Sequence, residues 1–249
     1  MATFRFYEEL NDFLPRERRA REFTTACARD ATTKHMIEAL GVPHTEVELV
    51  LVNGESSTFE RLIEEGDRIA VYPKFETFDI APLLRVRERP LRLRFVADAH
   101  LGGLARFLRM AGFDTVYRND IHDDEIEELA ARDERVVLTR DRELLKRRGI
   151  THGCYVHAIK PEEQLREVFG RLDLAGSVRP FSLCLNCNLP LRAVDKAGVA
   201  DQLPPAVRAQ HEEFNICDCC GGVFWKGSHW KRMTDLLARV ADVDPGPVP

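Results

Sequence analysis

The sequence predicts a multidomain protein of the α/β class, with a parallel sheet and flanking helices at its centre. A small α+β domain precedes this sheet, and a short metal-binding segment follows it. Three observations predict the arrangement: strand-like and helical patterns alternate in the middle of the chain, residues 1–78 combine one helical pattern with short strands, and paired cysteines stand near the C-terminus. A length of 249 residues has room for two or three such domains.

Residues 1–78 predict the small α+β domain, of the β-grasp kind. Residues 3–7 are apolar at every second position, and residues 33–40 have helical spacing that stops before Gly41, a residue typical of helix ends. Strand-like residues 48–52 run into Asn53-Gly54, the strongest short signal for a hairpin turn, and residues 68–72 predict a further strand. Residues 79–92 mix prolines and charges without periodicity, which indicates a linker.

Residues 93–180 predict the parallel sheet. Strand patterns at 93–97, 115–118, 135–139 and 154–159 alternate with helical patterns at 104–111, 123–132, 142–148 and 161–170. Strands that alternate with helices form right-handed crossovers and therefore lie parallel. Ligands of such sheets bind beyond the carboxyl ends of the strands.

Carboxylates follow three of these strands. Asp98 comes after the first strand, Asp123 and Asp124 after the second, and Asp141 after the third. Taken singly, each acid is also explained as a turn residue or a helix cap. Together they predict a site for Mg²⁺ or Mn²⁺, because crowded carboxylates need a cation and hard oxygen ligands select these ions. The neighbouring Arg106, Arg140 and Arg142 are suited to hold phosphates.

Two C-x-x-C pairs predict a structural zinc site over residues 181–233. Four thiolates can bind one tetrahedral Zn²⁺, and the ligands would be Cys184, Cys187, Cys217 and Cys220. Cys219 competes with Cys220 only if the second pair is shifted by one position. A closed four-thiolate site holds a structural rather than a catalytic ion. Residues 234–249 are expected to form a C-terminal helix and a loose tail.

Basic and aromatic residues follow the second cysteine pair. Lys226, His229 and Trp230 could stack on bases and contact phosphates, or Trp230 could instead pack the ribbon against the preceding domain. Global charge does not decide between these roles, because the net charge is −5 and no third of the chain has an excess of Lys and Arg.

The middle of the chain resembles PIN-like nucleases, and more closely the family named for the C-terminal RNase domain of the Mut-seven exonuclease. The matching segments are Phe95-Val96-Ala97-Asp98, residues 101–109, Asp123-Asp124-Glu125-Ile126 and residues 138–144. The resemblance covers residues 93–232 and implies that the metal-binding acids are Asp98, one or both of Asp123 and Asp124, and Asp141; of the adjacent pair, Asp123 is favoured. Many PIN nucleases have a fourth acid, for which Glu143 is a weak match.

The N-terminal domain resembles the ubiquitin-like sulfur-carrier proteins. The resemblance rests on Gly41-Val42-Pro43, Asn53-Gly54 and residues 66–73. Those carriers act through a free C-terminal Gly-Gly, whereas here the strand runs on into Lys74 and the chain continues. We therefore expect a docking or stabilising module rather than a carrier.

The sequence thus predicts a metal-dependent ribonuclease whose substrate is RNA. The alternative is a non-catalytic RNA-binding adaptor that uses the zinc ribbon and the β-grasp domain. Apolar runs are too short for a membrane span, and the N-terminus does not resemble a secretory signal. The seven cysteines, an odd number, argue against a disulfide framework, so we expect a reduced, cytoplasmic protein.

Overall fold

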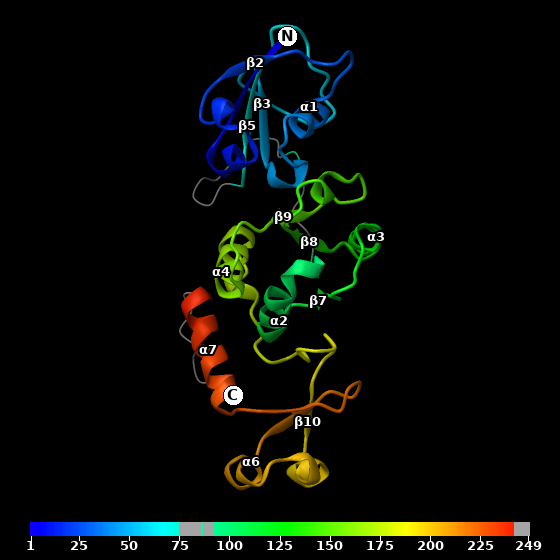
Figure 1. Cartoon of the computed structure of the whole chain (residues 1–249), viewed down its shortest axis with the longest axis vertical. Coiled ribbons are helices and arrows are strands. Elements are labelled where there is room, and N and C mark those ends of the chain that lie inside the picture. Colours follow the sequence, from blue (N-terminus) through cyan, green and yellow to red (C-terminus); the bar gives the residue numbers. More distant parts are fainter. Residues whose placement is uncertain (75–85, 87–91, 242–249) are drawn as a thin grey trace. The chain divides into compact units, whose positions relative to one another are not determined.

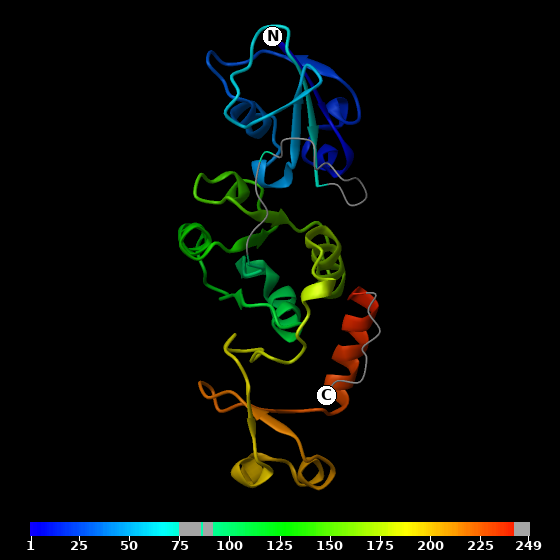
Figure 2. The same cartoon turned by 180° about the vertical axis from the view of Figure 1, so that it is seen from behind.

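The computed structural model describes residues 1–74, 86 and 92–241 (Figures 1 and 2). The chain divides into two compact units, one of Met1–Arg92 with Asp123–Tyr155 and the other of Leu93–His122 with Val156–Pro249. Of the predicted linker, only residues 86 and 92 are among the described residues, and the predicted tail over 242–249 lies outside them. Within the described residues, no helix is long and apolar enough to cross a membrane.

The first unit begins with the predicted β-grasp domain, a five-stranded sheet in the order β2-β1-β5-β3-β4. Strands β1 and β5 are parallel, and the other neighbouring strands are antiparallel. The sequence did not reveal β2. The elements of this domain are β1 (Ala2–Phe6), the 3₁₀ helices η1 (Glu8–Phe13) and η2 (Arg16–Arg18), β2 (Phe23–Thr25), α1 (Thr33–Ala39), the 3₁₀ helix η3 (His44–Glu46), β3 (Leu49–Val52), β4 (Glu55–Ser57) and β5 (Arg68–Tyr72).

Local chemistry explains the ends of these elements. The Thr32 side chain accepts a hydrogen bond from the backbone N–H of His35 at 3.2 Å and so caps the start of α1. The helix stops at Gly41, whose φ of +106° is open to glycine and strained for other residues. Asn53 and Gly54, at φ +54° and +89°, form the predicted two-residue turn between β3 and β4.

Asp67 fixes the turn before β5. Its carboxylate accepts hydrogen bonds from the Glu64 backbone N–H and the Asn53 side chain, both at 2.8 Å, and lies 3.3 Å from Arg61. Burial opposes ionisation of this carboxyl, but the two hydrogen bonds and the Arg61 charge outweigh that effect and lower the pKa of Asp67.

The first unit also contains part of the α/β domain. Its elements are α3 (Asp123–Asp133), β8 (Val136–Thr139), the 3₁₀ helix η5 (Leu144–Lys146) and β9 (Gly153–Tyr155), and β8 and β9 pair in parallel. The helix predicted over 142–148 is wrong, because only the single turn η5 forms there. Leu144 and Leu145 are both buried, and two adjacent leucines without apolar residues one turn away do not define a helix face.

The second unit holds the rest of the α/β domain. Strands β6 (Phe95–Ala97) and β7 (Thr115–Val116) pair in parallel. Helix α2 (Gly102–Met110) packs on α4 (Pro161–Leu172), which in turn contacts α7 (Ser228–Ala241) (Figure 1). The rings of Phe95, Phe113 and Phe169 meet edge to face in this core, with centroids 5.8 and 5.9 Å apart.

A three-stranded antiparallel sheet forms the ribbon of the second unit, in the order β10-β11-β12. Its elements are β10 (Arg192–Val194), α5 (Lys196–Val199), the 3₁₀ helix η7 (Ala200–Gln202), α6 (Pro205–Gln210), β11 (Phe214–Ile216) and β12 (Val223–Trp225). A small core of Val199, Leu203 and Phe214 lies beneath these strands. The C-terminal helix α7 begins at Ser228, six residues before the predicted start at residue 234. The predicted class, an α/β protein with a preceding small α+β domain and a following ribbon, is confirmed.

Candidate active site and zinc centre

Asp98 lies at the carboxyl end of β6, directly before the 3₁₀ helix η4 (Ala99–Leu101). Its side chain is 15% exposed, and its Oδ1 atom lies 3.5 Å from Nδ1 of the exposed His100. A carboxylate that is mostly buried at the end of a parallel strand lies where ligands of such sheets bind.

Asp123 and Asp124 form the first turn of α3 and are exposed. Arg147, which follows η5, bridges both of them: its guanidinium lies 3.5 Å from Asp123 Oδ2 and 2.5 Å from Asp124 Oδ1. It also reaches Glu127 at 3.2 Å. The hydrogen bond to Asp124 is the main reason why the pKa of Arg147 lies above its usual value. Sequence analysis did not single out Arg147, because a partner 23 residues away leaves no local pattern.

Asp141 follows β8 after one residue, and its loop is tightly turned. Its Oδ1 atom accepts a hydrogen bond from the Glu143 backbone N–H at 2.8 Å, and its own N–H donates to Thr139 Oγ1 at 2.9 Å. Asp141 therefore caps a turn, as the alternative interpretation expected, although no regular α-helix follows. Glu143, the weak match for a fourth acid, is exposed and binds Lys146 at 2.8 Å.

The predicted acids belong to different units. Asp123, Asp124 and Asp141 lie in the first unit, and Asp98 lies in the second. The structure confirms that each acid stands at a strand end or a helix start, and their assembly into one site stays a prediction. The three predicted phosphate-binding arginines, Arg106, Arg140 and Arg142, are all exposed, and Arg142 also donates to the Phe13 carbonyl at 3.2 Å.

The four predicted cysteines come together. Their sulfur atoms all lie within 4.8 Å of one another, and the Cys184 and Cys220 sulfurs are 3.8 Å apart, as expected for ligands of one tetrahedral ion. Backbone hydrogen bonding from Cys220 lowers the pKa of Cys217 to about 7, whereas contact with Cys220 raises that of Cys187. A divalent cation removes the conflict between neighbouring thiolates, so the donor set fits Zn²⁺. Cys219 and Cys220 are both exposed, but only Cys220 belongs to the cluster, which supports the predicted choice of Cys220.

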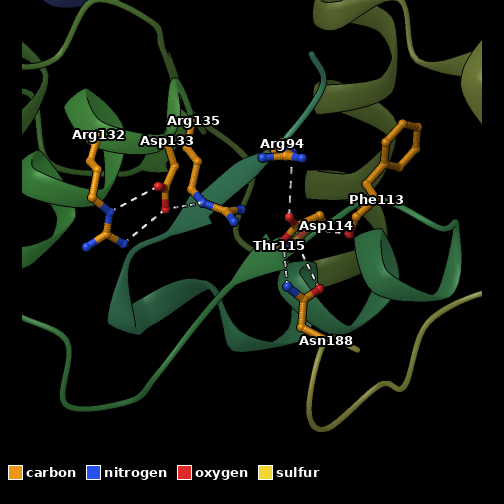
Figure 3. A network of polar contacts seen from close by, with 8 residues as sticks. All are labelled: Arg94, Phe113, Asp114, Thr115, Arg132, Asp133, Arg135 and Asn188. Carbon is orange, nitrogen blue, oxygen red and sulfur yellow. Dashed lines mark hydrogen bonds and ion pairs between the residues drawn. The ribbon is translucent and has the colours of Figure 1, made fainter. Parts of the chain in front are cut away.

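Two residues that the sequence did not indicate join the first cysteine pair to the α/β domain. Buried Arg109 of α2 donates three hydrogen bonds of 2.9 Å, to the carbonyl oxygens of Thr115, Leu185 and Asn186. Asn188 accepts from the Thr115 N–H at 2.9 Å and donates to the Asp114 carboxylate at 2.6 Å (Figure 3). The loop that bears Cys184 and Cys187 is therefore fastened to the edge strand β7.

The comparison with protein families agrees with these sites. The family model described as the Mut7-C RNAse domain matches residues 93–237, and the model described as Mut7-C ubiquitin matches residues 1–79. The chain belongs to the Mut7-C RNAse family. No curated protein and no solved structure matches it. All four candidate acids and all four clustered cysteines fall within the matched Mut7-C RNAse domain, and membership indicates a nuclease-like role.

The Mut7-C RNAse domain also has a hollow of about 1580 Å³ between the ribbon strands and α7. Its lining includes the predicted RNA-binding residues Lys226, His229 and Trp230. Lys226 binds Glu213 at 3.0 Å, and the Trp230 ring packs on Phe181 with centroids 5.4 Å apart. Trp230 therefore packs on a residue of its own ribbon segment, and its position in the hollow is compatible with base stacking. The alternative, that Trp230 packs the ribbon against the preceding domain, stays a prediction.

Proposed function

We propose that the chain is a metal-dependent ribonuclease that hydrolyses RNA phosphodiester bonds. Asp98, Asp123, Asp124 and Asp141 form the catalytic site in this proposal. The observation that carries it is membership of the Mut7-C RNAse family over the segment that holds all four acids. The local structure supports it, because each acid stands at the carboxyl end of a parallel strand or at the start of the following helix.

The donor set consists of carboxylate oxygens, which fit Mg²⁺ or Mn²⁺. Such an ion, when bound, supplies Lewis-acid activation of the phosphate and of the attacking water. In this proposal Asp98 and Asp141 would hold the ion, and Asp123 and Asp124 would supply further carboxylate oxygens. Arg147 orients these last two carboxylates and balances their charge.

The remaining predicted residues bind the RNA strand. Arg106 and Arg140 are exposed and contact phosphates, and Lys226, His229 and Trp230 guide a single strand along the hollow. Zn²⁺ in the four-cysteine site is structural: it holds the ribbon together and takes no part in hydrolysis.

The test is cleavage of a fluorescently labelled single-stranded RNA in the presence of Mn²⁺. The wild type is expected to cut it, EDTA to stop the reaction, and Asp98→Asn to abolish it. Asp120→Asn is the matched control, since Asp120 is an exposed acid of the second unit paired with Arg118. A wild type that retards RNA in a gel without cutting it would refute hydrolysis and favour the RNA-binding adaptor.

A further inference from the structure

A polar turn of the ubiquitin-like domain is buried in the first unit. The turn is η3, in which His44 is 5% exposed, Thr45 is fully buried and Glu46 is 2% exposed. Charged and polar side chains are seldom buried to this degree unless they have hydrogen-bonding partners. Here the partners of His44 and Glu46 include groups from the nuclease segment of the same unit, more than a hundred residues away in the sequence.

Two hydrogen bonds join this turn to the backbone of residues 150 and 155, the first before β9 and the second at its end. His44 Nε2 donates to the Ile150 carbonyl at 2.9 Å, while its Nδ1 faces Glu38 Oε1 at 2.7 Å. Glu46 Oε1 accepts from the Tyr155 backbone N–H at 2.7 Å. Glu46 thus binds a backbone N–H of the nuclease segment directly. Glu38 holds a backbone carbonyl of that segment through His44.

Apolar packing reinforces these bonds. Tyr155 packs against the hydrophobic core of the ubiquitin-like domain, and its ring meets Phe13 edge to face with centroids 5.1 Å apart. Gly153 allows the close approach, since a Cβ there would lie 2.5 Å from Leu145 and 3.3 Å from Thr45. The Phe13 carbonyl in turn accepts from Arg142, the neighbour of Asp141.

We infer that the ubiquitin-like domain is a positioning element of the nuclease, which holds residues 142–155 through η3 and Phe13. The carrying observation is that one side chain, Glu46, satisfies the backbone of β9 while Phe13 holds both Tyr155 and Arg142. This role differs from that of a separate docking module. Its consequence for catalysis, a fixed turn at Asp141, rests on the proposed function.

Hydrogen exchange of the full chain tests the inference without requiring activity. Glu46→Leu removes the acceptor for the Tyr155 N–H, and we expect amides of residues 142–155 to exchange about tenfold faster, as the loss of a buried hydrogen bond implies. Glu46→Gln keeps the Oε1 acceptor and should restore protection. Glu60→Leu, at an exposed glutamate of the same domain, is the matched control. Phe13→Leu keeps an apolar side chain but removes the ring contact with Tyr155, so it tests the attachment of the same segment if Glu46→Leu does not fold.

Four outcomes separate the possibilities. The positioning role is refuted if residues 142–155 keep wild-type protection in both Glu46→Leu and Phe13→Leu. It is also refuted if the loss of protection is confined to residues 1–74. If the wild type cleaves RNA, Glu46→Leu should lower kcat several-fold and leave KM unchanged, because Glu46 is a positioning residue that does not touch the substrate. If the wild type does not cleave RNA, the proposed function fails while the exchange result still decides the inference.

Discussion

Replacement of Arg109 tests how the zinc loop is joined to the α/β domain. Arg109 is 5% exposed, and its guanidinium donates to three carbonyl oxygens, those of Thr115, Leu185 and Asn186. Arg109→Met keeps most of the aliphatic volume but leaves these three acceptors, of which the Thr115 carbonyl is buried, without their donor. Burial lowers the pKa of Arg109, while the thiols of Cys184 and Cys187 oppose this shift and so favour its charge.

The expected loss follows from the hydrogen bonds. A bond from a charged donor contributes about 1.5–3 kcal/mol, and three bonds that share one side chain do not add fully. Removing the buried charge also removes its desolvation cost. We therefore expect Arg109→Met to lower the free energy of unfolding of the second unit by about 2–4 kcal/mol, which corresponds to about 5–15 °C in Tm for a unit of this size.

The assay combines thermal unfolding with the rate of zinc transfer to a coloured chelator. Arg109→Met should release zinc faster than the wild type. The zinc ion and its four thiolates together carry a net negative charge, which the positive charge of Arg109 offsets. Arg106→Met is the control, since Arg106 lies one turn earlier on α2 and is exposed. Equal Tm values and equal release rates for the two variants would refute the proposed role of Arg109.

Three further predictions concern the other sites. Asp141→Asn should abolish Mn²⁺-dependent RNA cleavage. It should also reduce the rise in Tm caused by Mn²⁺, with little change in the Tm of the metal-free protein. Cleavage at the wild-type rate would contradict the role of Asp141 as a ligand. Cys220→Ser should lose the bound Zn²⁺ measured by atomic absorption, whereas Cys219→Ser should keep it; equal losses would show that the ligand choice is wrong. The pKa of Asp67 is lower in the folded chain than in the unfolded one, so its contribution is complete above about pH 4 and disappears as the pH falls through the folded value. The stability difference between wild type and Asp67→Asn in urea should therefore shrink below about pH 4, and a constant difference down to pH 2 would contradict this.

Short-range signals predicted most of the fold. The turn at Asn53-Gly54, the helix end at Gly41 and the C-x-x-C pairs each depend on residues within a few positions of one another, so the sequence displays them directly. The strand β2 and the single turn η5 were missed or misassigned, because both are short and take their conformation from distant neighbours. The period of apolar residues carries too little information over three to seven positions.

The candidate site was predictable only in part, for the same reason. The acids could be found because each follows a recognisable strand. Arg147, Arg109 and His44 could not, since their partners lie at sequence separations of 23, up to 77 and 106 residues. A lone arginine or histidine has the same local appearance whether it is solvated or buried, so its role appears only once its partners are in place.

In both units a flanking module accepts a hydrogen bond from the backbone of a nuclease strand. In the first unit, Glu46 accepts a hydrogen bond from the N–H of Tyr155, the last residue of β9. In the second unit, Asn188 of the zinc loop accepts one from the N–H of Thr115 at the start of β7. A short strand with an open edge is marginal by itself, and a buried backbone group without a partner costs about 1–3 kcal/mol. Each flanking module thus supports one strand of the nuclease domain in its own unit, which explains why substitutions at residues other than the acids should impair that domain.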